Sequence, residues 1–249
     1  MKKFEYTPPE QPRELILKLG QKITDRIGHT VTAEDPEYYG LEALVTDEMA
    51  EVALKMKVRK PMTLAQIVKA TGKEEKVLEE LLQEMSNIGL LEYNWENPKH
   101  EKQYVLPMFV PGSAEFFNMK ADQIKEHPEV ASFFERMAFL PLQKVTPMVP
   151  PGGAGIGMHV IPVEKAIETE NESVSVEHIS HWLDKYDGKY AAGPCSCRYS
   201  RGVLGEGCAD DPEDWCIGVG DMADYLVETN KGHYICLLYT SPSPRDGLL

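Results

Sequence analysis

The first 194 residues contain no cysteine, although the whole chain of 249 residues has five. No apolar run reaches the length of about 18 residues that spans a bilayer, and residues 1–10 lack the apolar core of a signal peptide. These two absences argue against membrane insertion and secretion. We therefore expect a cytoplasmic protein, in which thiols stay reduced.

Positive charge is also scarce, since 26 lysines and arginines stand against 40 acidic residues and give a net charge of −14. An acidic surface repels nucleic acid and anionic membranes, so we expect neither as a partner. The chain also lacks a Gly-x-Ser-x-Gly elbow and a His-Glu-x-x-His helix, which gives hydrolase activity little support.

What the chain does have is a cluster of cysteines near its C-terminal end. The cluster contains Cys195, Cys197, Cys208 and Cys216. Thiolates are soft ligands that suit zinc, copper(I) and iron–sulfur clusters. Three glycines let the backbone fold closely around a bulky group, namely Gly202, Gly205 and Gly207. The pattern predicts a metal–thiolate site, with Arg198 and Arg201 offsetting the negative charge of four thiolates.

Other readings of the cysteines stay open. Two disulfides or four unrelated buried thiols fit a cytoplasmic protein less well. The spacing matches neither the zinc templates with two Cys-x2-Cys knuckles nor the bacterial ferredoxin run, so it does not name the metal. A nucleophilic cysteine is a further alternative, because Arg198 can lower the pKa of a neighbouring thiol.

The segments Cys-Ser-Cys-Arg-x-Ser-Arg, Gly-Glu-Gly-Cys, Trp-Cys-Ile and Gly-Asp-x-Ala-x-Tyr-Leu lie between residues 195 and 226. They resemble a module of iron–sulfur oxidoreductases of anaerobic bacteria, and the resemblance covers most of residues 36–235. It implies that the four cysteines are linked to a [4Fe–4S] cluster, without settling which of them ligate it. It also implies a downstream or partner oxidoreductase resembling the glutamate synthase small subunit, which would supply FAD or NAD(P).

The predicted fold class is α+β and mostly helical. A winged-helix-like domain, a helical connector and a small α/β cysteine-rich module follow one another. The expected boundaries are an N-terminal arm at 1–35, the winged-helix-like domain at 36–110, the connector with a Pro/Gly hinge at 111–157, the cysteine-rich module at 158–235 and a tail at 236–249. Asp35-Pro36 is interpreted as a break between the arm and the first of these domains.

The winged-helix prediction rests on three periodic apolar helices followed by two strands. The helices begin near Thr46, Thr63 and Val77, and the strands are expected at 90–93 and 103–106. This order resembles many bacterial transcription regulators. Residues 73–84, however, contain two lysines against five glutamates, which opposes contact with phosphates. A protein-docking or structural role is therefore preferred to DNA binding.

Several weaker signals complete the pattern. The aromatic residues of the connector are interpreted as core, the glycine run at 152–157 as a hinge, and His178 and His181 as solvent-facing. Residues 236–246 resemble translated sequencing adapter, so Cys236 is not expected to be a ligand and the natural chain is expected to continue beyond Ile235.

The sequence supports three candidate functions. The first is the truncated, iron–sulfur electron-transfer portion of a cytoplasmic oxidoreductase, working with a redox partner protein. The second is a zinc-stabilised winged-helix module that docks another protein. The third is a transcription regulator that senses redox state through a cluster.

Overall fold

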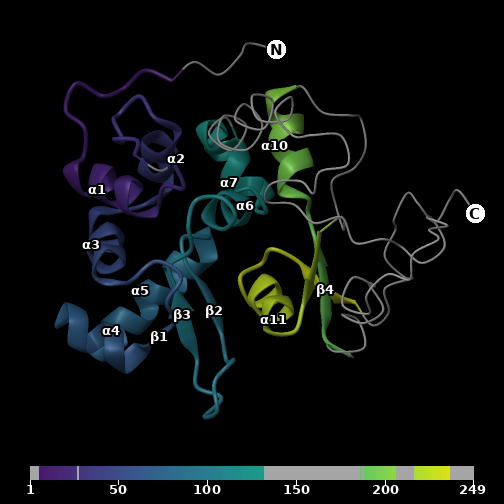
Figure 1. Ribbon diagram of the computed structural model, residues 1–249. Helices are drawn as coiled ribbons and strands as arrows, with labels where there is room; N and C mark the ends of the chain where they lie inside the picture. The colour runs from purple at the N-terminus through teal and green to yellow at the C-terminus, as the bar shows by residue number, and fades with distance from the viewer. Residues whose placement is uncertain (1–5, 27, 132–185, 187, 206–215, 236–249) are drawn as a thin grey trace, which may run out of the picture.

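Two small antiparallel sheets of three strands each, covered by helices, form the described part of the protein (Figure 1). The computed structural model describes residues 6–26, 28–131, 186, 188–205 and 216–235. About half of these residues are helical, which confirms the α+β class with a smaller helical share than expected. No helix within these ranges is long and apolar enough to cross a membrane.

The N-terminal half carries the first sheet. Its elements are α1 (Glu14–Ile23), α2 (Pro36–Leu44), α3 (Asp47–Lys55), β1 (Met62–Thr63), α4 (Leu64–Thr71), α5 (Glu75–Ile88), β2 (Glu92–Asn94) and β3 (Gln103–Val105). Strand β3 lies between β1 and β2, and Tyr104 is opposite both Met62 and Tyr93. The predicted helices and the two predicted strands are all present at these positions.

Local capping explains why these helices begin and end where they do. The Thr46 side chain accepts the Met49 N–H at the start of α3. Thr63 and Gln66 form a reciprocal capping box at the start of α4. Gly89 ends α5 in a left-handed conformation, and a Cβ there would lie 2.8 Å from Phe116.

The pair Asp35-Pro36 lies at the start of helix α2, because proline fits the first helical position, where no N–H partner is needed. One local prediction in this half was wrong. The apolar periodicity of the third predicted helix includes Val77, but this side chain is 47% exposed. The buried stripe runs through Leu78, Leu81, Leu82 and Met85, and Val77 lies one residue, about 100° of helical rotation, away from it.

The second half begins with two short connector helices, α6 (Ser113–Phe117) and α7 (Ala121–Glu126). The remaining elements are β4 (Tyr190–Gly193), α10 (Ser196–Leu204), β5 (Cys216–Val219), α11 (Asp221–Glu228) and β6 (His233–Ile235). The central strand β4 pairs with β5 on one side and β6 on the other. The expected strand at Tyr190–Ala192 and the helix after Cys216 are confirmed, whereas β5 and β6 were not predicted.

Several predictions fall outside the described residues. They concern Cys208, Gly207, the glycine run at 152–157, His178 and His181, and the tail at 236–249. The same holds for most of the helix that the apolar pattern predicts at 130–142, for a strand that it predicts at 159–163 and for a helix that it predicts around the two histidines.

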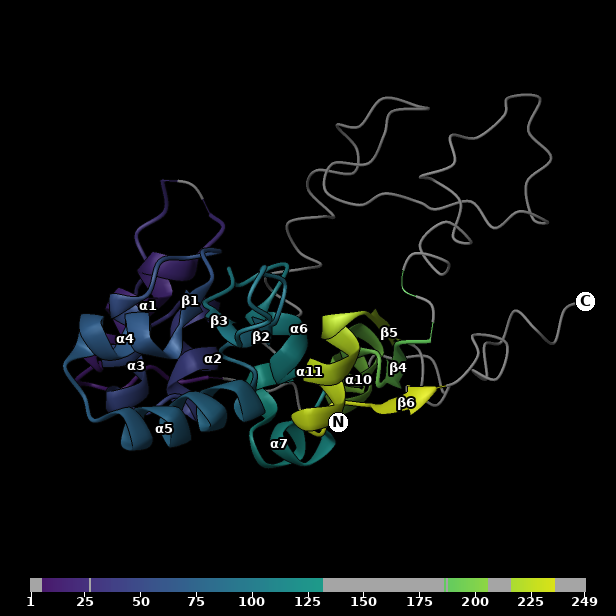
Figure 2. The same cartoon turned by 90° about the horizontal axis from the view of Figure 1, so that it is seen from below.

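The two halves share one core, in which α11 packs against β2 (Figure 2). The fully buried Tyr225 hydroxyl donates to the Leu91 carbonyl at 2.9 Å. The Lys231 ammonium, also buried, donates to the carbonyls of Ser86 at 2.8 Å and Asn87 at 3.0 Å. The carbonyls of Ser86 and Asn87 belong to the last turn of α5, where a helix leaves carbonyls without i+4 partners; the Ser86 carbonyl also accepts the Gly89 N–H at 3.1 Å. The C-terminal half therefore caps a helix of the N-terminal half.

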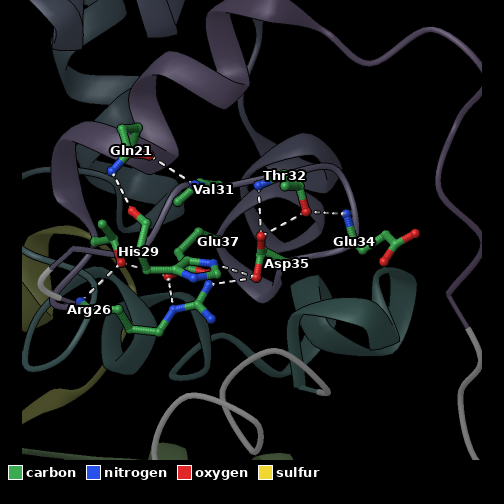
Figure 3. A network of polar contacts seen from close by, with 9 residues as sticks. Gln21, Arg26, His29, Val31, Thr32, Glu34, Asp35 and Glu37 are labelled. Carbon is green, nitrogen blue, oxygen red and sulfur yellow. Dashed lines mark hydrogen bonds and ion pairs between the residues drawn. The ribbon is translucent and has the colours of Figure 1, made fainter.

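A polar network ties the loop between α1 and α2 to the start of α2 (Figure 3). The Glu37 side chain is completely buried and accepts from Thr24 at 2.6 Å and from both ends of the Arg26 guanidinium. Arg26 also reaches Asp35, which His29 contacts at 2.9 Å. Burial alone would raise the pKa of Asp35, but hydrogen bonds from Arg26 and Thr32 lower it to about 2.

Replacing Arg26 with Met is expected to lower the free energy of unfolding by about 3 kcal/mol, because it leaves the buried Glu37 carboxylate without its cation. Urea denaturation at neutral pH measures the change. The control Lys18→Met removes the exposed i,i+4 pair with Glu14 and should cost less than about 1 kcal/mol. Equal losses in the two variants would contradict a supporting role for the network.

Replacing Lys231 with Met should destabilise the protein by about 1–3 kcal/mol, because the carbonyls of Ser86 and Asn87 at the end of α5 each lose a buried hydrogen bond. Hydrogen exchange should accelerate most in the last turn of α5. The control Lys76→Met changes an exposed lysine at the other end of the same helix. If hydrogen exchange in the last turn of α5 is the same in both variants, Lys231 does not cap that helix.

Candidate metal centre

Strand β4 leads directly into the cysteine cluster. It ends at Gly193, and Gly193 is directly opposite Cys216, the first residue of β5. Two residues further on, Cys195 is the N-cap residue of α10, and Cys197 lies in the first turn of that helix. The pairing of β4 with β5 therefore brings together two cysteines that lie 21 positions apart in the sequence.

Gly193 shows how tightly this strand is held. A Cβ at residue 193 would overlap the Lys231 carbonyl oxygen and lie 3.1 Å from the Met119 side chain. Only glycine lets the backbone approach so closely. The strand that positions the cysteines thus lies directly against the segment that caps α5.

Three of the four predicted ligand residues meet in this place, and no disulfide joins them. The Cys195 sulfur lies within hydrogen-bonding reach of both the Cys197 and the Cys216 thiols. All three side chains are partly exposed. Cys208, the fourth predicted ligand, lies in the segment 206–215, outside the described residues.

Hydrogen bonds among the three thiols shift their pKa values in different directions. Cys195 accepts from the Cys197 and Cys216 thiols, and this lowers the pKa of Cys195 well below that of a free thiol. The backbone N–H groups of Cys197 and Arg198 add to the effect, although the sulfur does not close a capping hydrogen bond of α10. These contacts favour the thiolate form at Cys195.

The pKa values of Cys197 and Cys216 move the other way. Each thiol donates to Cys195 and holds its proton there, which raises its pKa, and burial and the charge on Cys195 raise it further. The Ser196 side chain contacts Cys197, and the Ser196 backbone N–H contacts Cys216; both contacts act in the opposite, lowering direction.

The thiols come from regular elements, since Cys197 lies inside helix α10 and Cys216 opens strand β5. The local geometry differs from the sequence prediction at the glycines. The glycines were expected to wrap around a bulky group. Instead Gly202 is a helical residue with open space beside it, and Gly205 ends α10 in a left-handed conformation.

The two arginines predicted to offset thiolate charge both lie on α10, with Arg201 in its last turn. Arg198 acts on the site through its backbone N–H, which faces the Cys195 sulfur and lowers the pKa of that thiol. Compensation by the two guanidinium groups stays a prediction.

Two residues near the thiols carried no recognisable signal in the sequence. Ser196 is buried between the two cysteines that flank it, and its role depends on the position of β5. Glu115, on α6, lies close enough to Cys197 to affect it electrostatically. Burial raises the pKa of Glu115, although its carboxylate accepts the Gly112 N–H at 2.6 Å. Glu115 is distant in sequence from the cysteines, so only the packing of α6 against α10 reveals it.

The donor chemistry of this site suits a thiophilic metal or an iron–sulfur cluster, since all three converging side chains are thiols. Within the described ranges, however, no group of three or more Cys, His, Asp or Glu side chains is arranged to hold a metal ion. Comparisons with protein-family models, curated proteins and solved structures found no match to the chain.

In metal-free protein, iodoacetamide should alkylate Cys195 roughly tenfold faster than Cys197 or Cys216 at pH 7. Because the pKa of Cys195 is lowered, its rate should stay nearly constant from pH 8 to pH 6, whereas the rate of an ordinary thiol falls. Peptide mass spectrometry measures each site. Cys197→Ala removes one donor to Cys195 and should restore a pH-dependent rate. Equal rates at the three cysteines would contradict the assignment.

Proposed function

We propose that this chain is the iron–sulfur electron-transfer portion of a cytoplasmic oxidoreductase. The observation that supports it most directly is the meeting of Cys195, Cys197 and Cys216 at the start of α10. Three thiols converge from two elements, as ligands of one centre would. The resemblance of residues 195–226 to modules of anaerobic iron–sulfur oxidoreductases supports the same conclusion.

In this proposal the three converging cysteines, with Cys208 as the fourth, hold a [4Fe–4S] cluster. The bound cluster would supply one-electron transfer. The chain's own residues bind and orient it through their sulfurs, and the N–H groups near Cys195 offset part of the thiolate charge. Arg198 and Arg201 on α10 would contribute further positive charge, and such charge near the sulfurs raises a cluster's reduction potential.

Electrons would pass between this cluster and a redox partner protein or a downstream oxidoreductase domain. FAD or NAD(P) enters the proposal only through that partner or domain, because the chain has no nucleotide-binding fingerprint of its own. The half-exposed position of the thiols is compatible with transfer to a partner that docks beside α10.

A second candidate is a winged-helix module that docks another protein and is stabilised by zinc. The helix–strand–helix–helix–strand–strand order from α3 to β3, with β3 in the middle of its sheet, favours a winged-helix-like domain. In such a domain α5 would occupy the position of the recognition helix. Its outer face carries exposed glutamates, among them Glu79, Glu80 and Glu84.

The charge on that face disfavours the third candidate, a DNA-binding regulator. A groove of about 470 Å³ between α5 and β3 is bordered by these glutamates. Lys76 and Lys102 also line this groove, but the Lys102 ammonium lies over the Tyr93 ring, 3.7 Å from its centre. Phosphate contact needs exposed cations, and this surface offers mainly carboxylates.

Anaerobic reconstitution of the full chain with iron and sulfide tests the leading proposal. We expect a brown protein with broad visible absorption and about four irons per chain, as for a [4Fe–4S] cluster. Cys195→Ser and Cys216→Ser should each remove most of the absorption, because each deletes a converging sulfur. The control Cys236→Ser should leave it unchanged.

Zinc binding without colour would instead support the docking module. Failure to bind either metal, with no effect of Cys195→Ser, would overturn both metal-based proposals for this chain.

A further inference from the structure

A groove of about 400 Å³ lies between α1, α3 and the segment that follows α4. These three helices occupy the end of the molecule opposite the cysteine-bearing sheet, so the groove is separate from the thiols (Figure 2). Its lining combines an apolar floor with lysine side chains. We propose that this groove binds a small amphipathic carboxylate, the chemical class to which medium-chain fatty acids belong.

The floor of the groove is apolar. Leu15 comes from α1, and Val52 and Leu54 come from α3. Val52 is completely buried, whereas Leu15 and Leu54 keep part of their surface exposed while they pack against the core. The apolar body of a ligand would remove this remaining surface from water, which favours binding.

Polar contacts fix the two helices that carry this floor. The Arg13 guanidinium donates to Asp47 at 2.9 Å where α1 and α3 begin. The Lys22 ammonium donates to the Leu54 carbonyl at 2.6 Å where both helices end. Because the helices are held side by side at both ends, the groove is already formed before a ligand arrives, as is usual for small-molecule sites.

The charge of the lining is opposite in sign to that of the whole protein. Lys18 on α1, Lys55 in the last turn of α3 and Lys73 just after α4 come from three separate segments. Against these lysines stands one glutamate of the lining, Glu51, so the described lining has a net charge of +2. The whole chain has a net charge of −14. An anion is therefore attracted to this groove in preference to most of the surface.

The three ammonium groups can turn to a ligand at little cost. Lys18 pairs with Glu14 at 2.6 Å and Lys73 pairs with Glu48 at 2.7 Å, but more than half of each glutamate side chain is exposed. Exposed ion pairs of this kind contribute little to stability. Lys55 has no ion-pair partner among the described residues, so its charge needs none of these exchanges.

The size of the groove favours a small molecule over a protein partner. Small-molecule sites measure roughly 300–1,000 Å³, and this groove lies at the lower end of that range. Eight described residues line it, whereas a standard protein–protein interface uses about 20–30 residues on each side. Inorganic phosphate could pair with the ammonium groups but would leave the floor uncovered. A carboxylate with an apolar body uses both features.

The test compares octanoate with octan-1-ol, which has the same chain without the charge. The full-length protein is labelled with 13C at the leucine and valine methyl groups and titrated at pH 7, with NMR as the readout. We expect octanoate to shift the methyl signals of Leu15, Val52 and Leu54 saturably and to bind about tenfold more tightly than octan-1-ol. Inorganic phosphate at the same ionic strength should leave these three signals in place.

Matched variants identify the lysine that carries most of the attraction. Lys55→Glu should weaken octanoate binding by about tenfold, and Lys55→Arg should retain it. The control Lys99→Glu makes the same change in net charge at an exposed residue of the turn between β2 and β3 and should change the affinity less than about twofold. Circular dichroism confirms that each variant is folded.

Four outcomes would overturn the proposal. They are the absence of saturable octanoate binding, equal affinity for octanoate and octan-1-ol, methyl shifts spread evenly over the core, and equal weakening by Lys55→Glu and Lys99→Glu. The first three are measured on the unmodified protein, so they do not depend on the folding of any variant. None of them involves the cysteines, so this test and metal reconstitution give separate results.

Discussion

The described structure depends on the buried contact between the end of α5 and the segment after α11. The Lys231 ammonium donates to the carbonyls of Ser86 and Asn87 in the last turn of α5, and the Tyr225 hydroxyl donates to the Leu91 carbonyl just after that helix. Burial lowers the pKa of Lys231 well below its ordinary value, so placing this amine inside the core opposes its charged form. The hydrogen bonds offset that cost, and in doing so they fix the cysteine-bearing sheet against the N-terminal half. The geometry of the thiols follows from this contact, because Gly193 lies against the carbonyl of Lys231.

The parts of the fold that sequence reasoning predicted are those with local signals. Thr46, Thr63 with Gln66, and Gly89 mark helix ends through their own side chains or backbone freedom, and these ends are where they were expected. Strands β5 and β6 were missed because each gains its stability from pairing with β4, which no local pattern reports. Periodicity alone also misplaced Val77, since the buried face of α5 is set by what packs on it.

In the candidate site, too, sequence reasoning predicted what local patterns determine and missed what tertiary packing determines. Clustering of cysteines in the sequence predicted that thiols would meet, and three of the four do so. The different pKa values of the three thiols were not predictable, because they depend on which sulfur lies between the other two. Nor could the sequence reveal Ser196 and Glu115 as neighbours, since their positions depend on β5 and on the packing of α6 against α10. Composition predicted the charge of the α5 surface, but not that Lys102 turns inward over Tyr93.

The separation between Lys231 and the carbonyls that it caps has a consequence for synthesis on the ribosome. Ser86 and Lys231 are 145 positions apart, so the N-terminal half emerges long before the side chain that closes α5. Until then the last turn of this helix has carbonyls facing water, and the apolar surface that α11 will cover is open. Closing so long a loop is slow compared with forming local helices. The nascent chain therefore passes through a stage in which its N-terminal helices are formed but incomplete, and in which it depends on protection from aggregation.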